Sequence, residues 1–245
     1  MLVYVYDGSF EGLLTAIYEA YYRGRMPEGI LGQKNLQGSL TDEYVHIDTE
    51  PGKSDRVYRS ICEKISGESL QHVYYVFLSE HPEAGTIIFN YLKYGWKIGS
   101  RINLHISDDR VFKVHEISQR VGYEVNKLMG FVRFGQVEGG LFYAPFKPEN
   151  NILELLAPHF AERLADQSWI LHDVGRDTAA LYNKKTWVIS DFSVEELPAP
   201  TEEETENQRL WKEFFNTIAI PSRYNPKLQR QLMPRRYWDH MTEKW

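Results

Sequence analysis

Residues 131–146 read Phe131-Val-Arg-Phe-Gly-Gln-Val137, Glu138-Gly-Gly140 and Leu141-Phe-Tyr-Ala-Pro-Phe146. Two apolar runs on either side of a short glycine-containing turn are typical of a β-hairpin. The segment before Gly130 follows a different rule, because its apolar residues recur every three or four positions over about five turns of helix. The hydrophobic period therefore changes near Gly130, where the C-terminal half of the chain begins as a sheet.

The rest of the C-terminal half repeats the strand pattern around one helix. Asn151–Leu164 is predicted to be that helix, with Asn151 as its N-cap, Glu154 at the capping-box position and a kink at Pro158. The order strand, strand, helix, strand, strand, extended by a third strand after the helix, indicates an α+β fold with a small mixed or antiparallel sheet. The strands predicted after the helix are Trp169–Val174, Ala179–Tyr182 and Trp187–Ser190.

The N-terminal and middle parts of the chain are predicted to be rich in helices. Leu2–Tyr6 is predicted to be a first strand rather than a signal peptide, and Phe10 opens an apolar pattern of helical spacing. Gly24–Ser39 contains four glycines and a proline without periodicity and is predicted to be a loop. Further elements are predicted over Tyr44–Asp48 (strand), from Ser54 (helix), over Leu70–Trp96 (two helices, broken near His81-Pro82) and over Val111–Leu128 (the long helix).

The composition is that of a soluble globular protein, with 42% hydrophobic and 25% charged residues and a net charge of −6. Cys62 is the single cysteine, so the chain alone cannot form an internal disulfide or hold an iron–sulfur cluster. Its position within a predicted helix indicates a buried, inert thiol. The histidines show no metal-binding spacing, so no metal site is predicted.

No apolar stretch approaches the roughly 18–20 residues of a membrane helix, so a cytoplasmic location without a membrane partner is expected.

Charge is segregated near the C-terminus. Glu195–Glu206 holds six acidic residues and no basic one, which is typical of a linker or of the solvated first turn of a helix. Pro221–Trp238, here called the basic-aromatic tail, holds five basic residues and no acidic one. The predicted regions are therefore a core domain over 1–194, an acidic linker over 195–208, and a C-terminal helix with the tail over 209–245, docking on the core.

The basic-aromatic tail is the strongest candidate for a binding site. Cationic side chains neutralise phosphates, and aromatic rings stack on exposed bases. The alternative is structural: the aromatic residues dock into the core, while the arginines cap helices or pair with Glu195–Glu206. The acidic segment could also mask the tail until DNA or a partner competes for it. The candidate nucleic-acid-binding residues are Arg223, Lys227, Arg230, Arg235, Arg236, Tyr237 and Trp238.

A second group of candidates lies at the end of a predicted strand, where His172, Asp173 and Arg176 occur together. A histidine there could act as a general acid or base, but neighbours in a strand point to opposite faces, so His172 and Asp173 are not expected to form a dyad. The alternative is a turn stabilised by the aspartate.

Two weaker patterns have mainly structural interpretations. Ser9 opens a helix after a strand, where backbone N–H groups could bind an anion, but a helix cap at Ser9 with close packing at Gly12 is favoured. Glu116 and Arg120, like Arg120 and Glu124, lie four positions apart and predict ordinary ion pairs on the helix surface.

Six segments of the chain together resemble a bacterial family associated with DNA metabolism and repair, carrying domain of unknown function 4130. The closing Asn-Pro-x-Leu-Gln and Met-Pro-x-Arg-Tyr-Trp motifs carry the resemblance most specifically. The segments are Tyr6–Gly12, Gln71–Val76, Gly130–Phe134, Asn151–Phe160, His172-Asp173 and Arg223–Trp238.

The resemblance implies DNA as the substrate. Members of the family are encoded beside a radical S-adenosylmethionine protein, and a similar domain occurs fused to uracil-DNA-glycosylase-like modules. Because this chain has one cysteine, the iron–sulfur cluster and S-adenosylmethionine are expected on the partner. The leading hypothesis is a DNA-binding repair or modification protein that works with this partner. The alternatives are a nucleobase- or nucleotide-processing enzyme that uses His172, Asp173 and Arg176, and a protein–protein adaptor.

Overall fold

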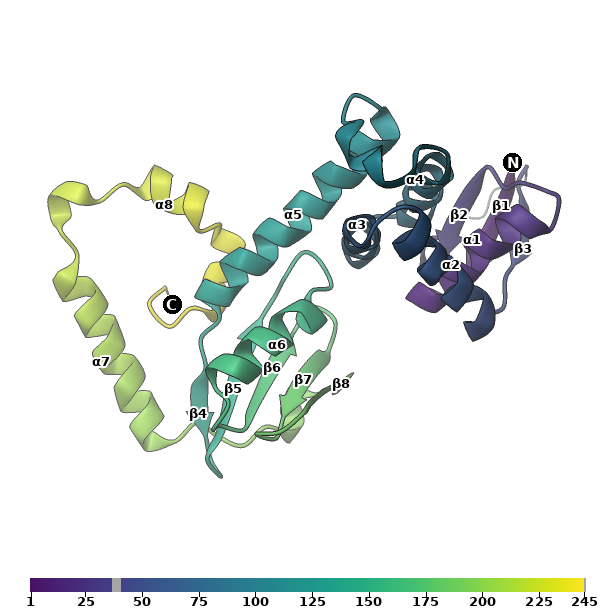
Figure 1. Cartoon of the computed structure of the whole chain (residues 1–245). Coiled ribbons are helices and arrows are strands. Elements are labelled where there is room, and N and C mark those ends of the chain that lie inside the picture. Colours follow the sequence, from purple (N-terminus) through teal and green to yellow (C-terminus); the bar gives the residue numbers. More distant parts are fainter. Residues whose placement is uncertain (37–40, 245) are drawn as a thin grey trace. The chain divides into compact units, whose positions relative to one another are not determined.

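The computed structural model describes residues 1–36 and 41–244 of the chain. Two compact units are present, Met1–Gly122 and the chain from Tyr123 onward (Figure 1). The α+β prediction is confirmed, because helices accompany a three-stranded and a five-stranded sheet. The predicted regions 1–194, 195–208 and 209–245 have different bounds from these units and stay a prediction. Residues 37–39 of the predicted loop lie outside the described residues.

The first unit contains a parallel three-stranded sheet in the order β2-β1-β3. Its central strand β1 has four of its five residues buried. One strand lies inside Gly24–Ser39, so the prediction of a loop is wrong there. The sequence Gly-Ile-Leu-Gly is too short to show alternation and begins and ends with a residue that strands disfavour. The strands are β1 (Leu2–Tyr6), β2 (Gly29–Gly32) and β3 (Glu43–His46).

Helices complete the first unit. The predicted break near His81-Pro82 separates α3 from α4, and α4 packs closely on β2. At this contact the hydroxyl group of Thr86 accepts a hydrogen bond from Ile30 N (3.0 Å) and donates its O–H to Ile30 O (3.1 Å). The helices are α1 (Phe10–Tyr22), α2 (Pro51–Lys64), α3 (Gly67–Leu78), α4 (Ala84–Ile98) and α5 (Asp109–Phe131), which continues into the second unit.

Cys62 is exposed, so the prediction of a buried thiol is wrong. The buried residues of α2 include Val57 and Ile61. Since each helical residue is rotated by about 100° from the one before it, Cys62 lies away from the stripe that Ile61 occupies.

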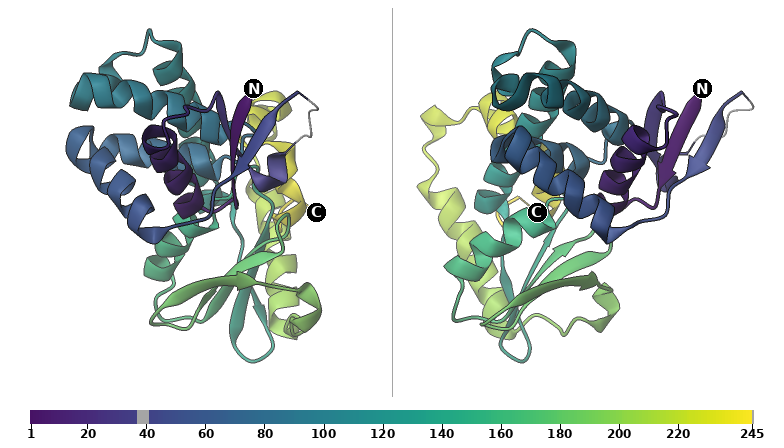
Figure 2. Two further views of the ribbon diagram at one scale, coloured as in Figure 1. Left: turned by 90° about the vertical axis from the view of Figure 1, so that its right-hand side faces the viewer. Right: turned by 45° about the vertical axis from the view of Figure 1, so that its right-hand side comes forward.

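The second unit contains a mixed sheet in the order β4-β5-β6-β7-β8, whose twist is visible in Figure 2. The predicted hairpin is formed by β4 and β5. A crossover through α6 (Leu153–Arg163) places β6 parallel to β5, and the remaining pairs are antiparallel. The strands are β4 (Gly135–Val137), β5 (Leu141–Phe146), β6 (Trp169–Asp173), β7 (Thr178–Tyr182) and β8 (Trp187–Asp191).

The start of α6 differs from the prediction. The N-cap residue is Ile152, which makes no side-chain cap hydrogen bond, so Asn151 with Glu154 does not form the predicted capping box. Ile152 is fully buried. Burial of this apolar side chain sets the first turn one residue later than the polar cap pattern suggests.

The acidic segment leads into helix α7 (Glu202–Ile218), and its second half forms the first turn of that helix. Thr201 caps the helix, because its side chain accepts a hydrogen bond from Glu204 N at 3.1 Å. Carboxylates in the first turn are favourable beside the positive end of the helix dipole. Helix α8 (Pro226–Leu232) and a 3-10 helix over Arg235–His240 follow. None of the helices in the described part of the chain is long and apolar enough to cross a membrane.

Candidate nucleic-acid interface

The five cationic side chains of the basic-aromatic tail are all exposed. Arg236 forms an ion pair with Glu149, with 2.7 Å between Nη1 and Oε1. The remaining four make no ion pair with any residue that the structure describes, although Nε of Arg230 donates to Pro226 O (3.1 Å). Among the residues that the structure describes, four cations of the tail therefore have no carboxylate partner: Arg223, Lys227, Arg230 and Arg235.

Tyr237 is the buried aromatic residue of the tail. Its side chain is 3% exposed, and its hydroxyl donates a 2.6 Å hydrogen bond to Oε1 of Glu124 on α5. Burial, together with this carboxylate, raises the pKa of Tyr237. Because its ring is enclosed, Tyr237 is docked in the protein, as the structural alternative predicts, and the ring is not accessible for stacking on a base.

Glu124 is buried at 4% exposure, so the prediction of a surface pair with Arg120 is wrong. Arg120 pairs with Glu116 instead, as predicted for that pair. Besides Tyr237, the Glu124 carboxylate accepts hydrogen bonds from Glu149 N (2.8 Å), Asn150 N (2.9 Å) and Asn150 Nδ2 (2.5 Å). A signal for this role exists in the sequence, since Glu124 lies on the buried stripe, three positions after Val121 and four before Leu128.

Trp238 is half-buried, with its indole N–H donating to Met233 O at 3.0 Å. Arg235 and Lys244 lie over its ring, at 5.7 and 5.0 Å from the ring centre. Tyr224, by contrast, is 72% exposed. The tail thus combines one docked ring, one ring flanked by cations and one ring open to solvent.

The acidic segment Glu195–Glu206 does not neutralise the tail through ion pairs in the part of the chain described. Glu206 pairs with Arg209 within α7 at 2.6 Å. Among the described side chains, none of the segment's carboxylates lies within ion-pair distance of a tail cation. The masking hypothesis therefore stays a prediction.

His172 and Asp173 have separate partners, in accordance with the alternation of a strand. Nδ1 of His172 lies 2.8 Å from the Tyr143 hydroxyl, and the imidazole is 1% exposed. Burial lowers the pKa of His172, which keeps the ring neutral near pH 7. His172 itself is enclosed, and it is not among the residues that line the cavity to which Tyr143 contributes.

Asp173 and Arg176 close the turn between β6 and β7. The fully buried carboxylate of Asp173 accepts from Arg176 Nη1 (2.8 Å) and from Gly175 N (3.0 Å). Arg176 also donates to the carbonyl oxygens of Pro148 (3.4 Å) and Glu149 (3.0 Å). This geometry matches the aspartate-stabilised turn.

The cavity beside Tyr143 has a volume of about 220 Å³ and lies within the second unit. Tyr143 lines this cavity, and its hydroxyl contacts Nδ1 of His172. Sequence reasoning missed this cavity, because its residues come from separate elements and share no local pattern. Its polar lining includes Arg133, Gln136, Tyr143, Gln208, Asp239 and His240.

Ser9 in the first unit has the geometry of a helix cap. Its hydroxyl accepts from Gly12 N at 2.9 Å, while the Asp7 carboxylate accepts from Ser9 N and from the Thr49 hydroxyl, each at 2.8 Å. Burial opposes ionisation of Asp7, but the hydrogen bonds from Ser9 and Thr49 outweigh it and the pKa of Asp7 is lowered. The ionised carboxylate of Asp7 therefore occupies the position near the start of α1 where an external anion would bind.

Comparison with known families gives one match. A family model described as a domain of unknown function, DUF4130, matches residues 82–243. The match begins just before α4 and covers the second unit almost to its end. No curated protein matches the chain.

Proposed function

We propose that this chain, which belongs to the DUF4130 family, is a DNA-binding protein of DNA repair or modification whose basic-aromatic tail contacts the phosphate backbone. The observation that carries the proposal is the set of four exposed tail cations without a carboxylate partner among the described residues. The link to repair or modification rests on the resemblance of the sequence to the family.

Electrostatics favour a polyanion as the ligand of the tail. Neutralising phosphates releases condensed counterions, so the logarithm of the binding constant falls with the logarithm of salt concentration by about 0.9 for each phosphate contacted. The net charge of −6 does not oppose this, because six acidic residues are concentrated in Glu195–Glu206. The hydrogen bond between Tyr237 and Glu124 holds one end of the tail on α5, which limits the entropy lost when DNA binds.

The proposal includes a radical S-adenosylmethionine protein as the partner that performs the chemistry. Cys62 is the only cysteine, and a cluster requires several thiolates. The iron–sulfur cluster and S-adenosylmethionine are therefore assigned to the partner, and this chain is assigned the DNA contact.

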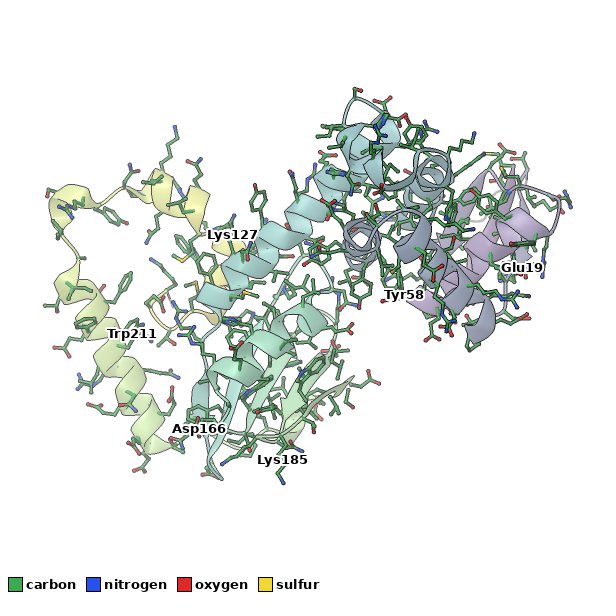
Figure 3. The ribbon with its side chains drawn as sticks, in the orientation of Figure 1. Glu19, Tyr58, Lys127, Asp166, Lys185 and Trp211 are labelled. Atoms are coloured by element: carbon green, nitrogen blue, oxygen red, sulfur yellow. The ribbon has the colours of Figure 1, made fainter. Side chains whose placement is uncertain are left out.

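The experiment is a fluorescence-anisotropy titration of single-stranded, duplex and uracil-containing DNA of about 20 nucleotides, over roughly 50 to 200 mM salt. The test variant is Arg223→Gln/Lys227→Gln/Arg230→Gln. The control, Arg163→Gln/Lys184→Gln/Lys185→Gln, removes the same charge from exposed positions elsewhere in the second unit; Lys185 is labelled in Figure 3.

The tail variant is expected to reduce the slope of the salt dependence by roughly 2.7, as the loss of three phosphate contacts predicts, and the control variant is expected to preserve it. A wild-type protein that binds no DNA would overturn the proposal. So would a folded tail variant that keeps the wild-type slope.

One observation favours an adaptor function as the second candidate. None of the residues of α7 is buried, and Leu210, Phe214 and Ile218 lie four positions apart with 49%, 53% and 56% of each side chain exposed. Trp211, labelled in Figure 3, is 43% exposed beside them. Such an apolar stripe suits a protein partner. Trp211→Ala/Phe214→Ala is expected to abolish capture of the purified radical S-adenosylmethionine protein without nucleic acid, whereas equal capture by wild type and variant would exclude this role for α7.

A further inference from the structure

A wide groove of about 790 Å³ lies in the first unit, formed by side chains of α1, α2 and α4. Its volume is within the range of about 300–1,000 Å³ that is usual for ligand sites. Aromatic rings come from α1 and α4, and cationic side chains come from α2. These residues are Tyr18, Tyr21, Tyr22 and Trp96, with Arg56, Arg59 and Lys64.

The rings form an ordered platform. Tyr18 and Tyr22 stack with 4.3 Å between their centres and 22° between their planes, and Tyr22 is 73% exposed. Tyr21 meets Trp96 edge to face at 5.1 Å. The indole N–H of Trp96 donates to the Ser60 hydroxyl at 3.0 Å, which fixes the plane of the indole. Tyr22 thus extends the stack of Tyr18 into solvent.

The cations beside the rings have no carboxylate partner in the described part of the chain. Nη1 of Arg56 donates to the Tyr18 hydroxyl at 3.2 Å, while Arg59 and Lys64 are exposed. The lining also contains one carboxylate, that of Glu63, so its three cations outnumber its negative charge. The groove therefore offers a positive wall next to an aromatic floor.

We propose that this groove binds an unpaired stretch of nucleic acid, with a base stacked on Tyr22 and phosphates against Arg59 and Lys64. Stacking rings combined with cations are the features that bind single strands, because every base has an aromatic face and every nucleotide carries a phosphate. An acidic protein segment would use the cations but leave the exposed ring of Tyr22 without a role. The inference rests on the proposed function in taking DNA as the ligand, but it assigns the contact to a different unit.

The groove lies mostly outside the region that defines the family. The match covers residues 82–243 and therefore includes Trp96 but none of the groove residues on α1 and α2. The tail would supply phosphate contacts to duplex or single-stranded DNA, while the groove would select DNA with unpaired bases.

The test uses the full chain with a fluorescein-labelled oligothymidylate of about 15 nucleotides and with a duplex of the same length. Tyr22→Ala removes the exposed ring, and Tyr22→Phe restores it. Arg59→Gln/Lys64→Gln removes the cations. The matched controls are Tyr58→Ala and Lys97→Gln/Arg101→Gln. Tyr58, labelled in Figure 3, is an exposed ring on α2 that does not line the groove.

Tyr22→Ala is expected to weaken binding of the oligothymidylate by about five-fold or more, since loss of a stacked ring typically has an effect of this size. Tyr22→Phe and both controls are expected to bind like the wild type. Arg59→Gln/Lys64→Gln is expected to reduce affinity and salt dependence together. Affinity for the duplex is expected to stay unchanged in all groove variants.

Three outcomes would overturn the inference, and they separate it from the proposed function. If the wild type binds the oligothymidylate and the groove variants bind it equally well, the groove assignment fails while the tail proposal stands. If the wild type binds no nucleic acid, both fail. If a polyglutamate peptide binds in a manner that depends on Arg59 and Lys64 while the oligothymidylate does not, the groove belongs to an acidic protein partner.

Discussion

The hydroxyl of Tyr237 donates a 2.6 Å hydrogen bond to the carboxylate of Glu124, which lies 113 positions earlier in the chain. Both groups are buried, and the other donors to this carboxylate are Glu149 and Asn150. The contact joins the basic-aromatic tail to α5. Together with the ion pair between Arg133 and Glu243 (2.7 Å), it fixes the C-terminal residues within the second unit.

Tyr237→Phe removes this donor while it keeps the ring. A buried carboxylate that loses one of its hydrogen bonds is expected to reduce the free energy of unfolding by about 1–3 kcal/mol. Urea denaturation followed by tryptophan fluorescence measures the change. Tyr224→Phe is the control, because the ring of Tyr224 is 72% exposed, and an equal loss in both variants would contradict a role for the buried contact.

Arg176→Gln is expected to destabilise the turn between β6 and β7. Asp173 would be left as a buried carboxylate without its cation, and removing one partner of a buried pair costs about 3 kcal/mol or more. Because Arg176 is partly exposed, the lower end of that range is expected. Thermal unfolding checks the change, with the exposed Arg163→Gln as the control. Unaltered stability together with loss of an enzymatic activity would instead support a catalytic role for this group.

Stability is expected to fall as the pH is lowered below about 6.5, partly through His72 in the first unit. Burial, and then the neighbouring His115, lower the pKa of His72 from its ordinary 6.5, although Glu68 opposes the shift. The unfolded chain therefore takes up a proton at a higher pH than the folded protein, so stability present above pH 6.5 is lost as the pH falls toward the lowered pKa.

His72→Gln is expected to flatten this part of the pH profile, because glutamine does not titrate but can still hydrogen-bond to the Ser118 hydroxyl, which lies 2.8 Å from Nδ1. Chemical denaturation at a series of pH values between 5 and 8 provides the measurement. An unchanged slope in the variant would show that His172 and His240, whose pKa values are also lowered by burial, account for the dependence.

Gly85→Ala is expected to separate α4 from β2. A Cβ atom at Gly85 would lie 2.5 Å from the backbone oxygen of Ile30, a contact that requires the helix to move. Overpacking of this kind typically costs about 1–3 kcal/mol. Gly67→Ala at the start of α3 is the control, because a Cβ there meets nothing within 4 Å. A neutral Gly85→Ala would show that the helix shifts freely on the sheet.

The types and order of most elements could be predicted from the sequence, because helical and strand periodicities are local properties. The long apolar repeat before Gly130 predicts most of α5, and the runs on either side of Glu138–Gly140 predict β4 and β5. The serine after β1 predicts the cap of α1. Only short or irregular features were missed, such as β2 and the capping of α6.

The charge pattern of the tail was likewise visible in the sequence, since five basic residues without an acid within Pro221–Trp238 need no structure to be recognised. Which of these side chains remain available was decided by packing. Tyr237 is enclosed on Glu124 and Arg236 is paired with Glu149, whereas Arg223 and Lys227 face solvent.

The sequence alone therefore determined the α+β class, the long helix and the concentration of positive charge near the C-terminus. The tertiary structure decided which surfaces those elements cover. It buried Glu124, exposed Cys62 and brought the rings of α1 and α4 beside the cations of α2. The physical reason is that periodicity depends on neighbours in the chain, whereas burial and the meeting of side chains depend on elements that are distant in sequence and packed together.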